Sequence, residues 1–313
     1  GYVEYAYAGD LKGNMWKFDL TGSSNSDWEV AYKSGSDKKP LMRAMNNDGG
    51  QPITVEPDVT RMDCSPDQKG YFVVFGTGRY LTADDFNSTD TQTFYGVWDW
   101  QKDWGSNPEG KYLGGFNVDG TDPELRTNLN QGELTLLKQW SNATKGRGNH
   151  TYRIFTDEPI NYPTPPSGET GTTYHAGWYY NLPDDRAQVV EDPMLRPAPG
   201  NDIGIVTFLS SIPSDSPCDA GGTSWIYQVS LCNGGQPDVS PFDTTGDDEV
   251  DEDDKFGDEA GSGKKYNQGL NEPTHQADEG GDKMIISTSE GDIITETVSS
   301  SPIGMIYWRL ITD

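Results

Sequence analysis

The densest group of potential metal ligands in this sequence lies in the acidic run Asp243–Asp254. When Asp243 is counted as the first position, oxygen-bearing residues follow at the spacing of an EF-hand-like or dockerin-like calcium loop. Carboxylates packed this closely repel one another unless a cation neutralises them, so the run predicts a calcium site. The alternative is a solvated acidic loop that holds no fixed ion. The predicted ligands are Asp243, Thr245, Asp247, Glu249 through its backbone carbonyl, Asp251 and Asp254.

Three positions of this run differ from the usual pattern of a calcium loop or fix its conformation. Asp248 stands where a calcium loop normally has Gly for its sharp turn, although Asp tolerates the left-handed conformation better than most residues. Asp254 is shorter than the usual Glu at the last position, so we expect it to offer one oxygen. Val250 is the apolar residue that we expect to turn inward and anchor the loop.

The three cysteines do not have the spacing of a zinc or redox motif. Cys218 and Cys232 flank a strand-like segment, which predicts a disulfide closing a loop of about 15 residues and stabilising the fold by about 3 kcal/mol. Such a bond would place the protein outside the cytosol. The alternative is a pair of buried free thiols. Cys64 is then left without a partner in this chain.

We find no catalytic arrangement in the sequence. The histidines His150, His175 and His275 are far apart, and neither HExxH nor GxSxG is present. The Gly-Thr-Gly at 76–78 follows a strand-like run but lacks the helix and third glycine of a dinucleotide loop, so we interpret it as a turn. Asp and Glu are abundant, but nothing singles out a catalytic pair. We therefore expect that the protein is not an enzyme.

The charge balance excludes whole classes of partner. Asp and Glu number 50 against 23 Lys and Arg, a formal net charge of −27, which disfavours binding to nucleic acid and to anionic lipid. No run of about eighteen apolar residues predicts a membrane span. The chain opens inside a strand-like alternation with no leader, and we expect a processed or truncated piece of a longer protein.

Most segments of the sequence have the alternating or β-branched pattern of strands, and these strands must position the residues above. Gly, Asn, Asp and Pro separate one predicted strand from the next. Only Gly132–Trp140 shows a short helical period. The predicted strands are Tyr2–Ala8, Asn14–Leu20, Tyr71–Phe75, Thr93–Trp100, Thr151–Phe155, Ile203–Leu209, Ser224–Leu231, Lys283–Ser289, Asp292–Val298 and Gly304–Ile311.

A loose repeat suggests how the strands are organised. Four segments, which begin at Ala8, Thr91, Ala220 and Ser301, combine small residues, a tight turn and a strand rich in aromatic residues. One such motif per unit is typical of β-propeller blades, and a β-sandwich is the alternative. The Pro-rich stretch 159–171 and the acidic, Gly-rich stretch 243–282 are predicted to be inserts, because neither can form its own packed core.

Collinear motifs give the chain a resemblance to the PilC/PilY family of type IV pilus biogenesis proteins. The first is the segment Tyr7–Leu20, which is similar to the family's hallmark strand-turn-strand. The others, in the family's order, are Gln51–Thr54, Val74–Leu81, Gly177–Pro183, Val189–Pro193, Pro217–Tyr227, Phe242–Asp254 and Tyr307–Leu310.

The resemblance implies an all-β fold, the C-terminal part of a modified β-propeller with long loop inserts, spanning residues 1–313. It also implies a secreted, extracellular protein at the pilus tip or outer cell surface that promotes pilus extension and attachment, with calcium bound in the propeller. The implied partners are minor pilins, a host or abiotic surface ligand and the N-terminal region of the same protein. The alternatives are a structural module stapled by calcium and a propeller enzyme such as a hydrolase or quinoprotein.

Overall fold

The computed structural model describes residues 3–64, 68–101, 111–120, 125, 132–163, 172–198, 200, 203–214, 221–277 and 282–300 of the 313-residue chain. Strands dominate this part of the chain, as the sequence predicts. Its helical segments are the short 3-10 turns η1 (Asn25–Asp27), η2 (Asp85–Asn87) and η3 (Glu252–Asp254).

The first sheet begins with a hairpin formed by the hallmark segment. The Asp10 carboxylate accepts hydrogen bonds from the backbone N–H groups of Lys12 and Asn14 and from the Trp16 indole, which fixes the turn. Gly13 has a φ of 81° and lies against the chain, where a Cβ would come 2.2 Å from the Ala44 carbonyl oxygen. The strand order is β1 (Tyr5–Gly9), β2 (Asn14–Asp19), β6 (Met42–Asn46) and β11 (Gly114–Asn117), with β3 (Glu29–Val30) on β2 and β7 (Gly49–Gly50) on β6. A separate hairpin joins β4 (Tyr32–Ser34) and β5 (Asp37–Lys39).

The second sheet corrects the prediction of a helix at Gly132–Trp140. This segment is the strand β12, which pairs in parallel with β15. Leu134 and Leu136 are buried on one face, so the two-residue period of a strand prevails over a helical period that spans little more than two turns. The order is β12 (Gly132–Gln139), β15 (Thr172–Asn181), β10 (Thr93–Asp99), β9 (Tyr71–Gly76) and β8 (Asp58–Arg61).

The third sheet shows that the insert predicted at 243–282 is too long. Residues 261–266 form a central strand of this sheet, paired on both sides. Its small residues are needed there, because a Cβ on Gly263 would lie 2.9 Å from the Tyr227 ring. The order is β13 (Ser141–Arg147), β14 (His150–Phe155), β19 (Gly261–Tyr266), β18 (Thr223–Ser230), β17 (Ile205–Ile212) and β16 (Met194–Arg196). The C-terminal sheet contains β20 (Thr274–Gln276), β21 (Asp282–Ser287) and β22 (Ile293–Val298).

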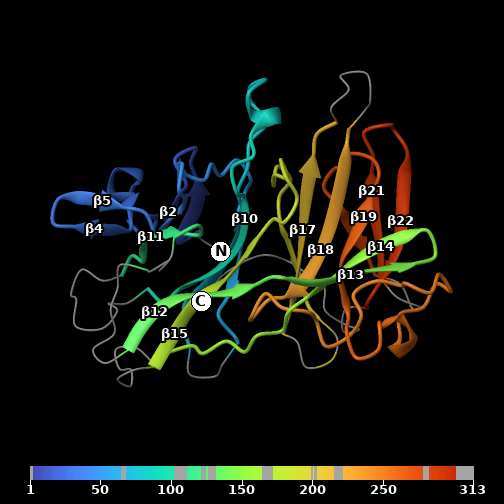
Figure 1. Ribbon diagram of the computed structural model, residues 1–313. Coiled ribbons are helices and arrows are strands. Elements are labelled where there is room, and N and C mark those ends of the chain that lie inside the picture. Colours follow the sequence, from blue (N-terminus) through green and yellow to red (C-terminus); the bar gives the residue numbers. More distant parts are fainter. Residues whose placement is uncertain are drawn as a thin grey trace.

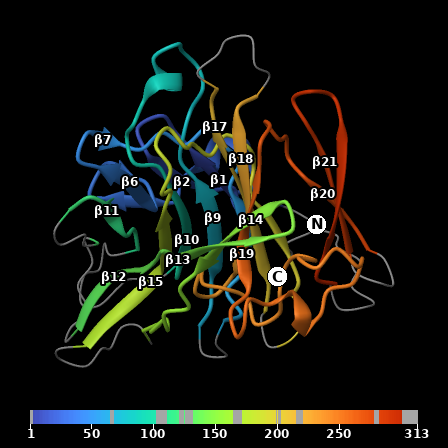
Figure 2. The same ribbon diagram turned by 45° about the vertical axis from the view of Figure 1, so that its right-hand side comes forward.

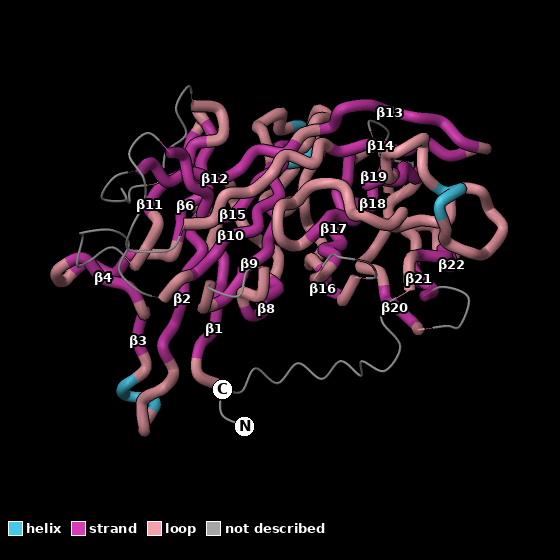
Figure 3. Tube along the Cα trace, turned by 90° about the horizontal axis from the view of Figure 1, so that it is seen from below, coloured by secondary structure: helices cyan, strands magenta, loops and turns pink. Residues whose placement is uncertain are grey.

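The four larger groups of strands lie across the molecule in the order first, second, third and C-terminal sheet (Figure 1). Figure 1 shows the first sheet in blue at one side and the C-terminal sheet in red at the other, and the order persists after a rotation of 45° (Figure 2). Seen from below, the three larger sheets lie side by side (Figure 3). Between the second and third sheets, Phe94 stacks on Phe208 and Phe155 on Tyr180, each pair with ring centroids 4.1 Å apart. Successive sheets packed in this way are arranged like propeller blades rather than like the two sheets of a sandwich.

The hydrophobic core is divided at the third sheet. One cluster of buried side chains runs through the first three sheets. A second, smaller cluster fills the space between the third sheet and the C-terminal sheet, and it includes Leu209, Ile226, Met284 and Ile286. The loop with the candidate calcium ligands leaves the fold beside this second cluster, because Phe242 belongs to it.

The predicted Cys218–Cys232 disulfide is wrong, because Cys232 is bonded to Cys64. The two Cα atoms are 5.5 Å apart and the residues are separated by 168 positions. The bond joins the segment after β8 to the turn that follows β18, a proximity created by the packing of the second sheet on the third. A disulfide closing a loop this long stabilises by about 5 kcal/mol in the chain-entropy model. Cys218 lies outside the described residues.

Other predictions also fall wholly or partly outside the described residues. The predicted strand Gly304–Ile311 is one of them. Of the Pro-rich stretch 159–171, residues 159–163 are described and contain no strand, and the rest is not described. Tyr162 packs inward here, with its ring edge-on to Trp98 and its hydroxyl donating to the Cys232 carbonyl oxygen at 2.5 Å.

Candidate functional site

The acidic loop, residues 243–254, is fixed to the fold at both ends. At its start, fully buried Phe242 forms a β-bridge with Val298 of β22. After its end, Phe256 forms a second bridge with Glu259, and the chain then enters β19. The loop therefore sits at the boundary between the third sheet and the C-terminal sheet.

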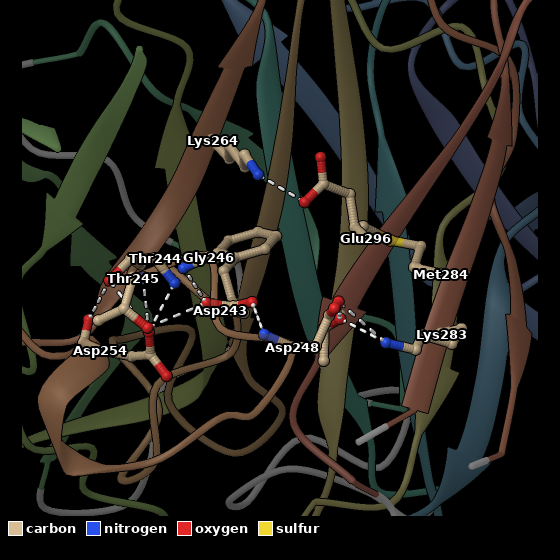
Figure 4. Close-up of polar contacts among 12 residues, drawn as sticks. Asp243, Thr244, Thr245, Gly246, Asp248, Asp254, Lys264, Lys283, Met284 and Glu296 are labelled. Carbon is tan, nitrogen blue, oxygen red and sulfur yellow. Dashed lines mark hydrogen bonds and ion pairs between the residues drawn. The ribbon is translucent and has the colours of Figure 1, made fainter. Parts of the chain in front are cut away.

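Two aspartates organise the interior of the loop (Figure 4). Asp254 is fully buried, and its Oδ1 accepts hydrogen bonds from the backbone N–H groups of Thr244 at 2.6 Å and Thr245 at 2.9 Å. Its Oδ2 accepts from the N–H of Asp251 at 2.9 Å. Asp243 accepts from the N–H of Gly246 at 2.6 Å and, through Oδ2, from that of Asp248 at 2.9 Å. Backbone donors thus satisfy both carboxylates, and both oxygens of Asp254 accept hydrogen bonds.

Asp248 confirms the prediction about the turn. It has a φ of 69°, in the left-handed region expected at this position of a calcium loop. Its Oδ1 accepts a hydrogen bond from the Thr297 hydroxyl at 3.2 Å and lies 3.5 Å from Lys283 Nζ (Figure 4). Both partners belong to the C-terminal sheet. The ion pair is largely exposed, so its contribution to stability is small. Val250 is only half-buried, which makes it a weaker anchor than expected.

The structure brings only some of the predicted ligands together. The Thr245 hydroxyl lies 3.2 Å from an oxygen of Asp243. Asp247 and Asp251 instead accept hydrogen bonds from the backbone N–H groups of Glu249 and Asp253. Within the described part of the chain, no three acidic, His or Cys side chains are gathered closely enough to hold a metal ion. The turn geometry fits a calcium loop, and the side-chain arrangement does not form a ligand cage.

Arg147 supports this loop, a role that no pattern in the sequence predicts. It lies at the end of β13 and donates through Nη1 to the Thr244 hydroxyl and the Asp253 carbonyl, both at 2.6 Å. Its Nη2 donates to the Lys255 carbonyl at 2.7 Å, and its guanidinium lies 4.4 Å from the centre of the Phe256 ring. No motif marks this residue. Its one sequence signal is that it is a cation beside a Gly-containing turn, in a chain with few cations.

The histidine on the strand that pairs with β13 is not suited to be a base for this loop. His150 begins β14. Burial lowers the pKa of His150 below its ordinary value, and Lys264 lowers it further. The loop itself contains no histidine, and residues 243–259 carry ten acidic side chains against one lysine. The arrangement can therefore attract cations, but it offers no group suited to proton transfer near neutral pH.

Comparison with known proteins covers nearly the whole chain. The family model described as the PilY1 beta-propeller domain matches residues 1–117. The type IV pilus biogenesis factor PilY1 of Pseudomonas aeruginosa strain PAO1 is 30% identical over 335 residues, covering 99% of this chain and 26% of that protein. A PilY1 homolog of Xylella fastidiosa is 31% identical over 243 residues, covering 75% of this chain and 14% of the relative. The chain belongs to the PilY1 family.

The fold agrees with this membership. The crystal structure of the P. aeruginosa PilY1 C-terminal domain matches 96% of this chain and 58% of its own, with a TM-score of 0.66 and 23% identity. The fold is therefore all-β and of the modified β-propeller type, as predicted. The chain spans about a quarter of the length of PilY1. These relatives are named for pilus biogenesis rather than for a reaction, which agrees with the expectation that the protein is not an enzyme. Among the described residues, no helix has both the length and the apolar character that crossing a membrane requires.

Proposed function

We propose that this chain is the C-terminal propeller portion of a type IV pilus biogenesis factor, exported to the pilus tip or outer cell surface. The observation that carries the proposal is the 30% identity to PilY1 over 99% of the chain. In this role the protein promotes pilus extension and contacts minor pilins, together with the N-terminal region of the same protein. Its acidic surface suits an extracellular protein.

Complementation of a deletion strain tests this role. The full-length protein is expected to restore surface pili, and the same protein lacking these 313 residues is not. The same comparison in a strain that cannot retract pili separates pilus assembly from opposition to retraction. If the truncated protein restores pili only in that strain, these 313 residues act by opposing retraction. Full piliation by the truncated protein, at equal surface levels, would contradict the proposal.

Attachment to a host or abiotic surface is a separate part of the proposal. It is supported by the resemblance and by the solvent-facing acidic loop, not by a bound ligand. An excess of the purified 313-residue chain should reduce the attachment of piliated cells. Undiminished attachment would contradict an adhesive role and favour a structural module.

Calcium binding by the acidic loop is a further part. Its support is the ligand spacing of the sequence and the left-handed Asp248. Asp243, Thr245, Asp247, Asp251 and Asp254 with the Glu249 carbonyl would hold the ion, which would neutralise the loop. Calorimetric titration with CaCl₂ should show one site, and an Asp247→Ala and Asp251→Ala double variant should lack it. Equal binding by the variant would contradict this assignment.

A further inference from the structure

A buried ion pair connects the first and second sheets, far from the acidic loop. Lys17 lies on β2 and Asp99 ends β10, 82 positions away. Lys17 Nζ is 2.8 Å from Asp99 Oδ2, and the two side chains are 2% and 0% exposed. Removing both charges from water is costly, so the pair needs an unusually complete set of partners.

Aromatic rings enclose the lysine. Its Nζ lies 4.1 Å from the ring centre of Tyr5 and 5.4 to 5.5 Å from those of Tyr7, Tyr32 and Tyr71. These rings exclude water from the pair. Burial lowers the pKa of Lys17, while Asp99 opposes the shift. The enclosure therefore favours the uncharged amine more than a surface site does.

The carboxylate of Asp99 has donors on both oxygens. The Tyr7 hydroxyl donates to Oδ2 at 2.6 Å, beside Lys17 Nζ. On the other side, Oδ1 accepts from the Tyr32 hydroxyl and from the backbone N–H of Gln101 at 3.1 Å. Gln101 has a φ of 65°, a conformation that non-glycine residues rarely adopt and that is concentrated at functional sites. Two converging donors on one carbonyl oxygen have the geometry of an oxyanion hole.

We propose that Lys17 and Asp99 condense to an intramolecular amide that covalently joins the first and second sheets. A proton moves from Nζ to Oδ2 along their hydrogen bond, leaving a neutral amine and a carboxylic acid. The amine attacks Cγ, and Tyr32 with the Gln101 N–H stabilises the charge that develops on Oδ1. The Cγ–Oδ2 bond then breaks, Oδ2 leaves as water with a second proton from the nitrogen, and Tyr7 assists its departure. One Nζ–Cγ bond forms and one water is released, with no oxidant or cofactor.

Physical chemistry favours this outcome at the site. The fold holds the two groups in contact, which replaces a bimolecular encounter with a unimolecular step. The amide removes two charges from a low-dielectric interior, and its carbonyl oxygen keeps the Tyr32 and Gln101 donors. Burial and Asp99 raise the pKa of both Tyr7 and Tyr32 well above the ordinary value, so these hydroxyls remain protonated donors.

A second buried pair provides an internal control. Lys264 and Glu296 are 2.5 Å apart, but the Glu296 side chain is 12% exposed. Water can reach this carboxylate, so we expect the pair to remain ionic. A Lys264→Arg substitution should accordingly leave the proposed bond unaffected.

The intact mass of the folded chain, measured after reduction and alkylation of its cysteines, tests the proposal directly. It should be lower by one water than the mass calculated for the alkylated chain. Trypsin should then fail to cut at Lys17 and should release peptide 13–33 joined to peptide 80–102. A mass equal to that calculated for the alkylated chain, with both peptides separate, would overturn the proposal and show an ion pair only.

Variants make the assignment specific. The Lys17→Arg and Asp99→Ala variants cannot form the amide, so each should have its full calculated mass, without the loss of one water. Asp99→Asn keeps the carbonyl, so its bond should form with loss of ammonia in place of water. Tyr32→Phe should slow formation of the bond in freshly refolded protein without changing the final product. Loss of water in Lys17→Arg would place the modification elsewhere and overturn the assignment, even if another variant fails to fold.

Discussion

Asp99 and Asp254 are both fully buried, yet they are stabilised in opposite ways. Asp99 meets a lysine and two tyrosine hydroxyls between two sheets. Asp254 meets only backbone N–H groups and a hydroxyl of its own loop, within ten residues along the chain. The first arrangement connects parts of the fold that are distant in sequence, and the second shapes one local segment.

The difference has energetic consequences. A buried charge that loses its opposite charge cannot be rehydrated without opening the interface between the sheets. A loop that loses its central acceptor can detach from the surface and hydrate its N–H groups, which limits the cost. We therefore expect global effects from changes at Asp99 and local effects from changes at Asp254.

The largest effect is expected from Asp99→Ala. This substitution prevents the proposed amide and leaves Lys17 buried without its counter-charge, so the free energy of unfolding should fall by at least about 3–5 kcal/mol. Urea denaturation measures it. A Lys17→Met and Asp99→Leu double variant is the control, because it removes both charges and should lose less. Equal losses in the two proteins would show that the uncompensated charge is not the cause.

Asp254→Ala should have a smaller and more local effect. Three backbone N–H groups lose their acceptor, so we expect the free energy of unfolding to fall by about 1–3 kcal/mol. Local opening of the loop limits this cost. Hydrogen exchange at the amides of Thr244 and Thr245 should accelerate, while exchange in β9 and β10 stays unchanged. Asp258→Ala, an exposed acidic neighbour, is the matched control. Uniformly faster exchange across all sheets would contradict the local role.

Arg147→Ala should have the next largest effect. We expect the free energy of unfolding to fall by about 1–2 kcal/mol, because the substitution removes a cation that joins the β13–β14 hairpin to the acidic loop. Exposed Lys145 lies two residues earlier on the same strand, and Lys145→Ala should be neutral. Thermal unfolding of both variants measures the difference. If both substitutions have the same effect, net charge rather than the three hydrogen bonds of Arg147 supports the loop.

Calcium should have the smallest effect on stability. If the acidic loop binds the ion, calcium at about ten times Kd should stabilise the chain by about 1.4 kcal/mol, seen as a melting shift that EGTA reverses. Asp258→Ala should keep this shift, and the Asp247→Ala and Asp251→Ala double variant should lose it. A shift of the same size in the double variant would contradict binding at these ligands.

Sequence patterns predicted those features that depend on neighbours along the chain. Alternation located strands such as β2, β10 and β18, and the acidic run indicated the left-handed turn at Asp248. The same reasoning failed for β12, whose helical period is overridden by parallel pairing with β15. It also failed for β19, because a strand of small and charged residues has no hydrophobic signal of its own and is covered by rings from its neighbours.

The sequence by itself determined the all-β class, the family and the acidic loop, because alternation, collinear motifs and charge density are local properties. Only the tertiary structure decided that Cys232 bonds Cys64, that Arg147 supports the acidic loop, and that Lys17 meets Asp99. These contacts join residues that are 168, 97 and 82 positions apart. Their formation depends on how one sheet packs on the next, which no spacing along the chain records.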